Sequence, residues 1–159
     1  MLKSLKMLST AGALAFAAVA FAQSASAGEC PAGKVMAGAM KPGATMPKDV
    51  TDNVIGSIDL GQGYNIAGKT MRLRKLVIQP GGVVPWHSHA ERPANIYVVE
   101  GAVTEYRSTC AVPIEHKAGE VAVESGDLAH WWKNNTTKQT VLISADIVAT
   151  PAMEKEGGM

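Results

Sequence analysis

Short runs of β-branched, aromatic and aliphatic residues follow one another from Val54 onward, and turn-forming Gly, Pro, Asn and Asp residues separate them. Runs of this length between such turns are typical of β-strands. The periodicity of an amphipathic helix is absent from this region. The segments that we expect to form strands are VIGSIDL, MRLRKLVIQ, ANIYVVE, AVTEYRS, EVAVES, HWWKN and TVLISADIVA. The pattern therefore predicts an all-β sandwich or barrel.

Two of these segments show how the strands relate to solvent. In MRLRK, Met71 and Leu73 share one face of the strand, and Arg72 and Arg74 share the other. We expect the arginines on a solvated outer face; the functional alternative directs them toward a carboxylate substrate. NIYVVE and TVLIS are more continuously apolar, which is typical of strands covered on both faces.

The chain begins with the three parts of a secretory signal peptide. Lys3 and Lys6 give a positive start, residues 11–22 form an apolar run, and the small residues ASA end at Ala27. The apolar run is shorter than the roughly 20 residues of a membrane-spanning helix. We expect cleavage after Ala27, no stable membrane anchor after cleavage, and a periplasmic or secreted protein. An uncleaved membrane anchor is the alternative.

Composition divides the rest of the chain into three parts. Residues 28–50 are rich in Gly, Ala and Pro and predict an irregular N-terminal arm. Residues 51–150 contain the strand-like segments and are long enough to form one domain with its own core. Residues 151–159, PAMEKEGGM, predict a flexible tail.

Charge and cysteine content narrow the choice of partners and compartment. The formal net charge is +1, and it becomes −1 when Lys3 and Lys6 leave with the signal peptide. This balance does not indicate a nucleic acid as partner. The two cysteines, Cys30 and Cys110, favour one disulfide in an oxidising exported compartment, with two free thiols as the alternative.

The histidines carry the candidate chemistry. His87 and His89 are separated by one residue, so on a strand both imidazoles point to the same face. Taken alone, the pair could also be two exposed polar residues at the rim of a sheet. His130 can complete a metal site if the sheet curls into a small barrel. We expect His116, in the polar segment PIEHKAGE, to lie in a turn at the surface.

Two segments resemble the conserved motifs of the cupins. PGGVVPWHSHAERPANIYVVEG resembles the first motif, in which a glycine precedes HxH and another glycine closes the strand; GEVAVESGDLAHWWKNN resembles the second. The matching residues are Gly81 or Gly82, His87, His89, Gly101, Gly119, His130 and Asn134. The resemblance covers roughly residues 68–148. It implies a single double-stranded β-helix, or jelly-roll barrel, a metal ion held by the three histidines, and a homodimer.

One departure from the first motif concerns the metal ligands. Ala94 stands where cupins usually carry a ligand glutamate. Glu91 is nearby, but Arg92-Pro93 follows it and the proline stiffens the chain, so we do not expect Glu91 to take that place. Three neutral histidines can still hold a divalent ion. Glu105 and Tyr106, on the next strand, are candidates for side chains that reach inward.

Three functions remain in view. The first is a metal-dependent oxygenase or isomerase that uses Fe, Mn, Ni, Cu or Zn to act on a small molecule. The alternative is a non-catalytic cupin that binds a small molecule or a metal, and a purely structural module is a third possibility. Trp86, Trp131 and Trp132 flank the candidate ligands, as a pocket lining or as core, and adjacent Trp131 and Trp132 must send one ring inward and one outward.

Overall fold

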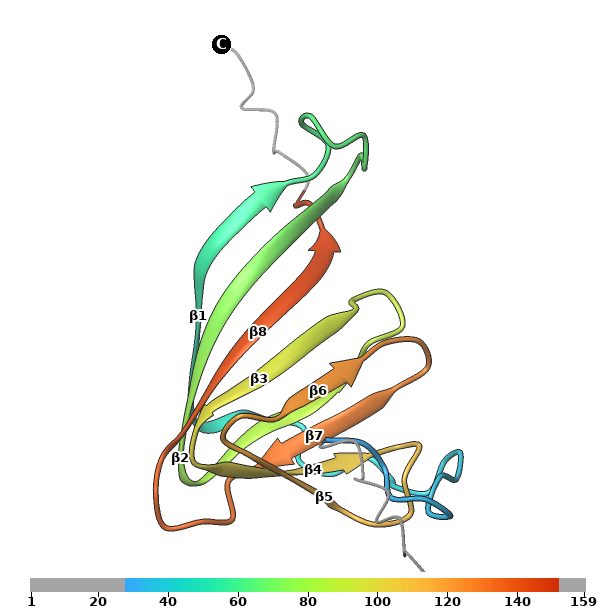
Figure 1. Cartoon of the computed structure of the whole chain (residues 1–159), viewed down its shortest axis with the longest axis vertical. Helices are drawn as coiled ribbons and strands as arrows, with labels where there is room; N and C mark the ends of the chain where they lie inside the picture. Colours follow the sequence, from blue (N-terminus) through green and yellow to red (C-terminus); the bar gives the residue numbers. More distant parts are fainter. Residues whose placement is uncertain (1–27, 152–159) are drawn as a thin grey trace, which may run out of the picture.

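The computed structural model describes residues 28–151, and this part is all-β with no helix (Figure 1). The expected signal peptide, residues 1–27, and residues 152–159 of the expected tail lie outside the described residues. Within the described part, no helix is long and apolar enough to cross a membrane. The strands are β1 (Lys48–Asp59), β2 (Lys69–Ser88), β3 (Ala94–Glu100), β4 (Ala102–Arg107), β5 (Ile114–Lys117), β6 (Val121–Glu124), β7 (Ala129–Lys133) and β8 (Thr140–Ala149).

The long strand β2 connects the two halves of the barrel. The strand order is β5-β4-β7-β2-β8-β3-β6, and β1 also pairs with β2. The first part of β2 pairs with β1 and β8, and its last part pairs with β7. Between them the chain turns at Gly81, which has a φ of 76°, and at Gly82, where a Cβ would lie 2.7 Å from the Asp49 carbonyl oxygen. The result is a nearly closed jelly roll of antiparallel strands, as the resemblance to the cupins implies, with β1, β2 and β8 extending together beyond the other strands (Figure 1).

The inner face of the sheet changes from apolar to charged along the strands. Its apolar part is a cluster of buried residues on β2, β3, β4, β6, β7 and β8, which includes Leu76, Val98, Trp132 and Leu142. Further along the same face, the strand registers pair Arg72 with Asp146, Asp146 with Ala94, and Ala94 with Glu124. Direct cross-strand partners point to the same side of a sheet. This row therefore places charged side chains inside the barrel.

The expectation that Arg72 and Arg74 lie on a solvated outer face is wrong. Met71 and Leu73 are the exposed pair, at 41% and 39%. Both arginines lie on the inner face and form ion pairs with Asp146, whose side chain is fully buried. The alternation of the strand is as expected, but the buried carboxylate on β8 compensates the arginine charges inside the barrel.

The N-terminal arm is tied to the barrel by a disulfide between Cys30 and Cys110, as expected from the cysteine content. The arm then runs along the barrel, where the backbone N–H of Trp86 donates to the Ala44 carbonyl oxygen at 2.8 Å. The expected division of the paired tryptophans is confirmed: Trp132 is buried in the core, whereas Trp131 is only partly buried.

Candidate metal centre

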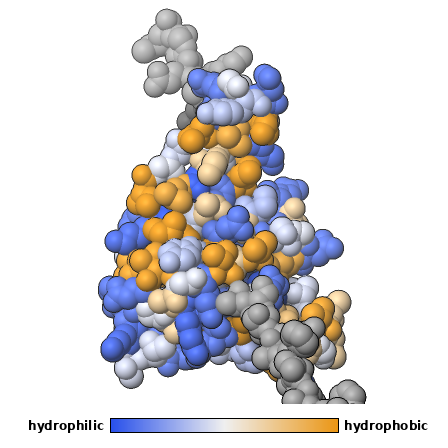
Figure 2. Space-filling model, viewed as in Figure 1, coloured by the Kyte–Doolittle hydropathy of each residue, from blue (hydrophilic) through white to orange (hydrophobic). Residues whose placement is uncertain are grey.

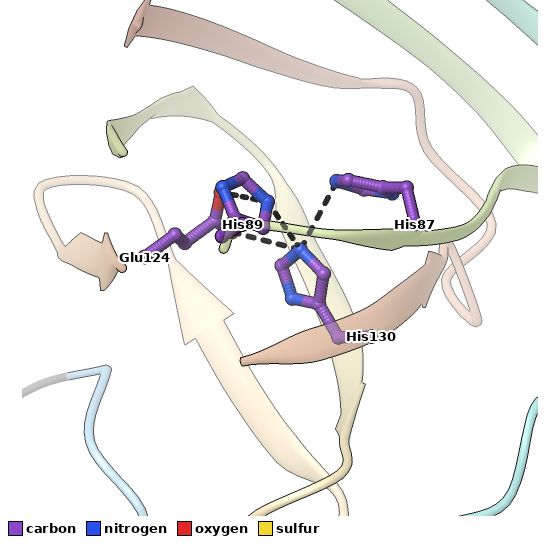
Figure 3. Close-up of side chains that lie close together, drawn as sticks. All are labelled: His87, His89, Glu124 and His130. Atoms are coloured by element: carbon purple, nitrogen blue, oxygen red, sulfur yellow. Dashed lines mark hydrogen bonds and ion pairs between the residues drawn. The ribbon is translucent and has the colours of Figure 1, made fainter. Parts of the chain in front are cut away.

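Three imidazoles from two strands meet at one point inside the barrel. His87, near the end of β2, is the direct register partner of His130 on β7, and His89 comes just after β2 ends. The His130 Nε2 atom lies 3.0 Å from Nε2 of His89 and 3.2 Å from Nε2 of His87. All three rings therefore present Nε2 to a common centre (Figure 3).

A carboxylate that the sequence analysis missed joins this centre. Glu124 extends from β6, with one oxygen 3.1 Å from the His89 Nε2 and the other 3.4 Å from the His130 Nε2. The four ligand atoms lie within 4.8 Å of one another. Glu124 is the register partner of Ala94, the position at which the cupin motif usually has its glutamate. The carboxylate therefore comes from the neighbouring strand instead of β3.

One sequence signal could have identified Glu124. The segment VAVE alternates, and Glu124 shares its parity with Ala122, which is fully buried. A charged residue at a position expected to point inward is a candidate ligand or ion-pair partner.

Hydrogen bonds determine which nitrogen of each ring is free. The Nδ1 atoms of His87 and His89 lie 2.8 and 2.7 Å from the backbone oxygens of Pro85 and Arg92, and Nδ1 of His130 lies 2.5 Å from a Glu105 carboxylate oxygen. The backbone oxygens are acceptors, so Nδ1 of His87 and of His89 carries the proton and Nε2 presents a lone pair. His130 Nδ1 faces both the Glu105 carboxylate and, at 3.0 Å, the indole N–H of Trp132; we assign its proton to Nδ1 because the carboxylate is the closer partner.

Several lone pairs thus face one another without a donor. The Glu124 Oε1 is also buried without a hydrogen-bond partner. Ligand atoms about 2.1 Å from one ion, at angles between 90° and 109°, are separated by about 3.0–3.4 Å. Four of the nitrogen and oxygen separations, 3.0, 3.1, 3.2 and 3.4 Å, match that spacing, and the ligand atoms as a set lie within 4.8 Å of one another. The cluster could therefore hold one metal ion.

The protonation states of the cluster suit a cation. Burial lowers the pKa of His87 to about 4 and that of His89 to about 3, and it also lowers the pKa of His130, so the rings are neutral at pH 7. Burial, with the nearby Glu105 charge, raises the pKa of Glu124 well above its usual value. The charges of Arg107, Arg92 and Arg74 offset this increase only in part, so the metal-free carboxyl group of Glu124 favours its protonated form, and a divalent ion would displace that proton.

Glu105 supports the centre from the adjacent layer of the barrel. One of its oxygens accepts from Nδ1 of His130 and from Nε of Arg107 at 2.9 Å, and the other lies 2.9 Å from Nε2 of His116. Burial alone would raise the pKa of Glu105, but the hydrogen bonds from His116 and His130 outweigh it and hold the pKa below its usual value. Of the two inward candidates on this strand, Glu105 is the one that is fully buried.

His116 is buried, so its expected surface position is wrong. It lies on β5 with its ring stacked on Trp132, the ring centroids being 4.7 Å apart at 18°. The buried Glu105 carboxylate attracts the imidazole into the interior. Asn134, the last residue of the second motif, is also buried and donates to the carbonyl oxygens of Ile78 and Lys138, so it stabilises a loop and does not contact the centre.

The cupin domain family matches residues 74–146, which include both histidine segments. Residues 74–146 belong to the cupin superfamily. The fold of this cupin is similar to the cupin domain of Schizosaccharomyces pombe Cnp3, with a TM-score of 0.51 and 9% identity over 65% of this chain and 66% of that one. It is also similar to an oxalate oxidase in complex with the substrate analogue glycolate, with a TM-score of 0.50 and 20% identity over 70% of this chain and 60% of that one.

The matched regions thus span less than two thirds of the length of either solved structure, and at these identities the likeness establishes the fold alone. No curated protein matches this cupin in sequence.

A small cavity adjoins the four clustered side chains of this cupin. It measures about 20 Å³, enough for one or two water molecules, and His87 and Glu124 lie in its wall. Arg74 lines the same cavity together with apolar residues that include Trp132 and Leu142. A metal ion in the cluster would therefore have a free side that faces a small, mostly apolar space.

Glu105→Gln tests whether this carboxylate positions His130. The substitution keeps the size of the side chain but removes its charge, so the His130 ring loses its fixed orientation. We expect Zn²⁺ affinity, measured by competition with a chromophoric chelator, to fall about 10- to 100-fold. Glu115→Gln, on the exposed face of β5, is the matched control and should leave the affinity unchanged. An unchanged affinity in a folded Glu105→Gln variant would contradict the assignment.

Proposed function

We propose that this cupin is a metal-dependent enzyme that binds one divalent transition-metal ion through His87, His89, His130 and Glu124. The ion would be Fe, Mn, Ni, Cu or Zn, and the reaction would be that of an oxygenase or an isomerase on a small molecule. The supporting observation is that the Nε2 atoms of three histidines meet beside the buried Glu124 carboxyl group, whose Oε1 has no hydrogen-bond partner. When bound, such an ion supplies a Lewis-acidic centre, and most of these metals add redox chemistry.

The residues around the centre suit this chemistry. Neutral imidazoles and one carboxylate would leave the ion with one positive charge, compared with two in a site of three histidines alone. The buried apolar side chains beside the cavity leave room for little water, which strengthens electrostatic interactions at the centre. Glu105 holds the His130 proton on Nδ1 and so keeps its Nε2 available.

Cobalt substitution tests the proposal. We expect one Co²⁺ per chain and a change in the visible absorption spectrum on addition of azide, because an enzyme needs an exchangeable coordination position. One ion per chain without any azide response would indicate a closed structural site and contradict catalysis. Absence of binding after reconstitution would contradict the metal proposal itself. A metal that exchanges azide but turns over no small molecule would favour the non-catalytic alternative.

Moving the carboxylate between strands tests the role of Glu124. Glu124→Ala should weaken Zn²⁺ binding at least about tenfold, since it removes the negatively charged ligand. Because Ala94 is its cross-strand partner, the double change Ala94→Glu/Glu124→Ala should recover part of that affinity. The uncharged control Ala94→Gln/Glu124→Ala should recover none. Equal affinities for the wild type and Glu124→Ala would exclude Glu124 as a ligand.

We also propose that the protein is exported and that cleavage occurs after Ala27. The disulfide between Cys30 and Cys110 supports this, because such bonds persist in oxidising compartments. We expect the protein recovered from the periplasm of a Gram-negative host to have the intact mass of a chain that begins at Gly28, and to contain no reactive thiol. A full-length mass, or thiols that react with iodoacetamide in the native protein, would contradict export and cleavage.

The outer face of the sheet supports a homodimer. Tyr97, Val99, Val121 and Val123 on β3 and β6 are 42–50% exposed, and apolar side chains form patches over the visible surface (Figure 2). Strands that are apolar on both faces are normally covered on both. A second copy of the chain can cover this outer face without an additional partner.

Val123→Lys tests this interface. A lysine at the centre of a buried interface would leave an unpaired charge, so we expect light scattering to show a monomer where the wild type is a dimer. Gln62→Lys, in the exposed loop between β1 and β2, is the control and should remain dimeric. A monomeric wild type at micromolar concentration would contradict the proposal.

A further inference from the structure

Gly28 packs against the buried imidazole of His116. Gly28 is itself buried, and its φ of 88° lies in the region that favours glycine. A Cβ on Gly28 would collide with the carbonyl oxygen of Val121 and would lie 3.0 Å from Nδ1 of His116. Two residues further on, the disulfide from Cys30 to Cys110 fixes this segment to the barrel. A side chain therefore does not fit at this position, and polar atoms of β5 and β6 face it.

Both of these polar atoms are hydrogen-bond acceptors. Nε2 of His116 lies 2.9 Å from a Glu105 carboxylate oxygen, so we assign the proton to Nε2 and a lone pair to Nδ1. This Nδ1 is buried and has no hydrogen-bond partner among the described residues. The carbonyl oxygen of Val121 is the second acceptor. Because a buried acceptor without a donor costs free energy, a donor placed between these two atoms would stabilise the folded chain.

The charges near this position favour a cation. Arg107 is buried and donates to Glu105 at 2.9 Å, and its Nη1 lies 3.9 Å from a carboxylate oxygen of Glu29. Within this group, two carboxylates face one guanidinium, which leaves one negative charge in excess. Glu29 directly follows Gly28 in the chain. A positively charged donor on Gly28 would therefore balance the charge of the group and also satisfy the two acceptors.

Cleavage after Ala27 would create such a donor. Hydrolysis of the Ala27–Gly28 peptide bond leaves a carboxylate on residue 27 and an ammonium group on Gly28, which is mostly charged at neutral pH because α-amino groups titrate at about 7.7–8.0. Rotation about the Cα–C bond of the freed glycine can carry this nitrogen to the place that a Cβ would take. There it lies within hydrogen-bond distance of His116 Nδ1 and, after a shift of a few tenths of an ångström, of the Val121 oxygen. In an uncleaved chain the same rotation would have to carry residue 27 into the interior.

We propose that the α-ammonium group of Gly28 turns into the barrel after cleavage and donates to Nδ1 of His116 and to the Val121 carbonyl oxygen. This inference rests on the proposed signal-peptide cleavage and gives the new terminus a positioning role. Donation to Nδ1 keeps the His116 proton on Nε2, where Glu105 accepts it, and Glu105 also accepts from His130. Cleavage thus completes a chain of hydrogen bonds that ends at the candidate metal centre.

Three chains with defined first residues test this inference. A cleavable fusion partner gives chains that begin at Gly28, at Ala27 or at Glu29, and all three are compared with the disulfide formed and in the same metal state. We expect an acetylating reagent at pH 7 to modify the α-amine of the Gly28 chain at least about tenfold more slowly than that of the Ala27 chain, because a buried amine reacts only after local opening. Mass spectrometry of the N-terminal peptide measures the rates, and unfolding in guanidinium should abolish the difference.

NMR of the ¹⁵N-labelled histidines provides a second measurement. In the Gly28 chain we expect the His116 Nδ1 resonance of an unprotonated nitrogen that accepts a hydrogen bond, shifted from its position in the Ala27 and Glu29 chains. Both control chains should also have a Tm several degrees lower, because they lack the buried donor. Equal acetylation rates, or a His116 Nδ1 resonance that is the same in the Gly28 and Ala27 chains, would overturn the inference.

The protein recovered from the periplasm separates this inference from the proposed cleavage. If that protein retains its first 27 residues, the cleavage proposal fails, while a protected amine in the prepared Gly28 chain would still support the ammonium site. If the recovered protein begins at Gly28 but its amine reacts as fast as that of the Ala27 chain, cleavage stands and the inference is overturned.

Discussion

The antiparallel register between β3 and β6 determines where the interior of the barrel keeps its negative charge. By pairing Ala94 with Glu124, it brings a carboxylate to the histidines from the strand beside the one that lacks it. Direct cross-strand partners have Cβ atoms about 4.5–5.5 Å apart, a distance that a glutamate side chain spans easily. A slip of one residue would turn Glu124 to the outer face and remove it from the cluster. The short side chain of Ala94 is as necessary as the carboxylate, because a larger residue would occupy the space between Glu124 and Asp146.

Compensation of buried charge explains the remaining polar residues of the interior. Glu105 is compensated by Arg107 and by hydrogen bonds from His116 and His130. Asp146 is compensated by arginines from β2 and from the loop before β3. Glu124 lacks such a partner among the described residues, and the Nε2 atoms that surround it present lone pairs. A cation at this point would serve the stability of the folded chain as well as its chemistry, since an uncompensated buried carboxylate is costly.

Some features of the site follow from local rules and others do not. The HxH spacing on a strand predicts that His87 and His89 point the same way, and the turn residues predict a barrel that brings His130 to them. Glu124 could not be found by counting along the first motif, because its relation to Ala94 depends on pairing between strands that are distant in sequence. The polar residues around His116 led to the wrong prediction that it lies at the surface, because its buried partner, Glu105, lies on another strand.

The arginines of β2 show the same limit of local sequence patterns, which do not reveal partners on other strands. Alternation in MRLRK correctly separates the two faces, but it does not say which face is inside. The usual assumption places charge outside and apolar residues inside. Here the order is reversed, because Asp146 on β8 stands opposite Arg72 and the exposed Met71 and Leu73 face outward.

Arg92 connects the histidine cluster with the arginines: its carbonyl oxygen accepts the His89 proton in a hydrogen bond, while its guanidinium binds Asp146. Because the residue before a proline is restricted to extended backbone, Pro93 limits the backbone conformations of Arg92 and so the positions of its carbonyl oxygen. The position of the His89 imidazole and that of the arginine cluster therefore both depend on one residue, Arg92.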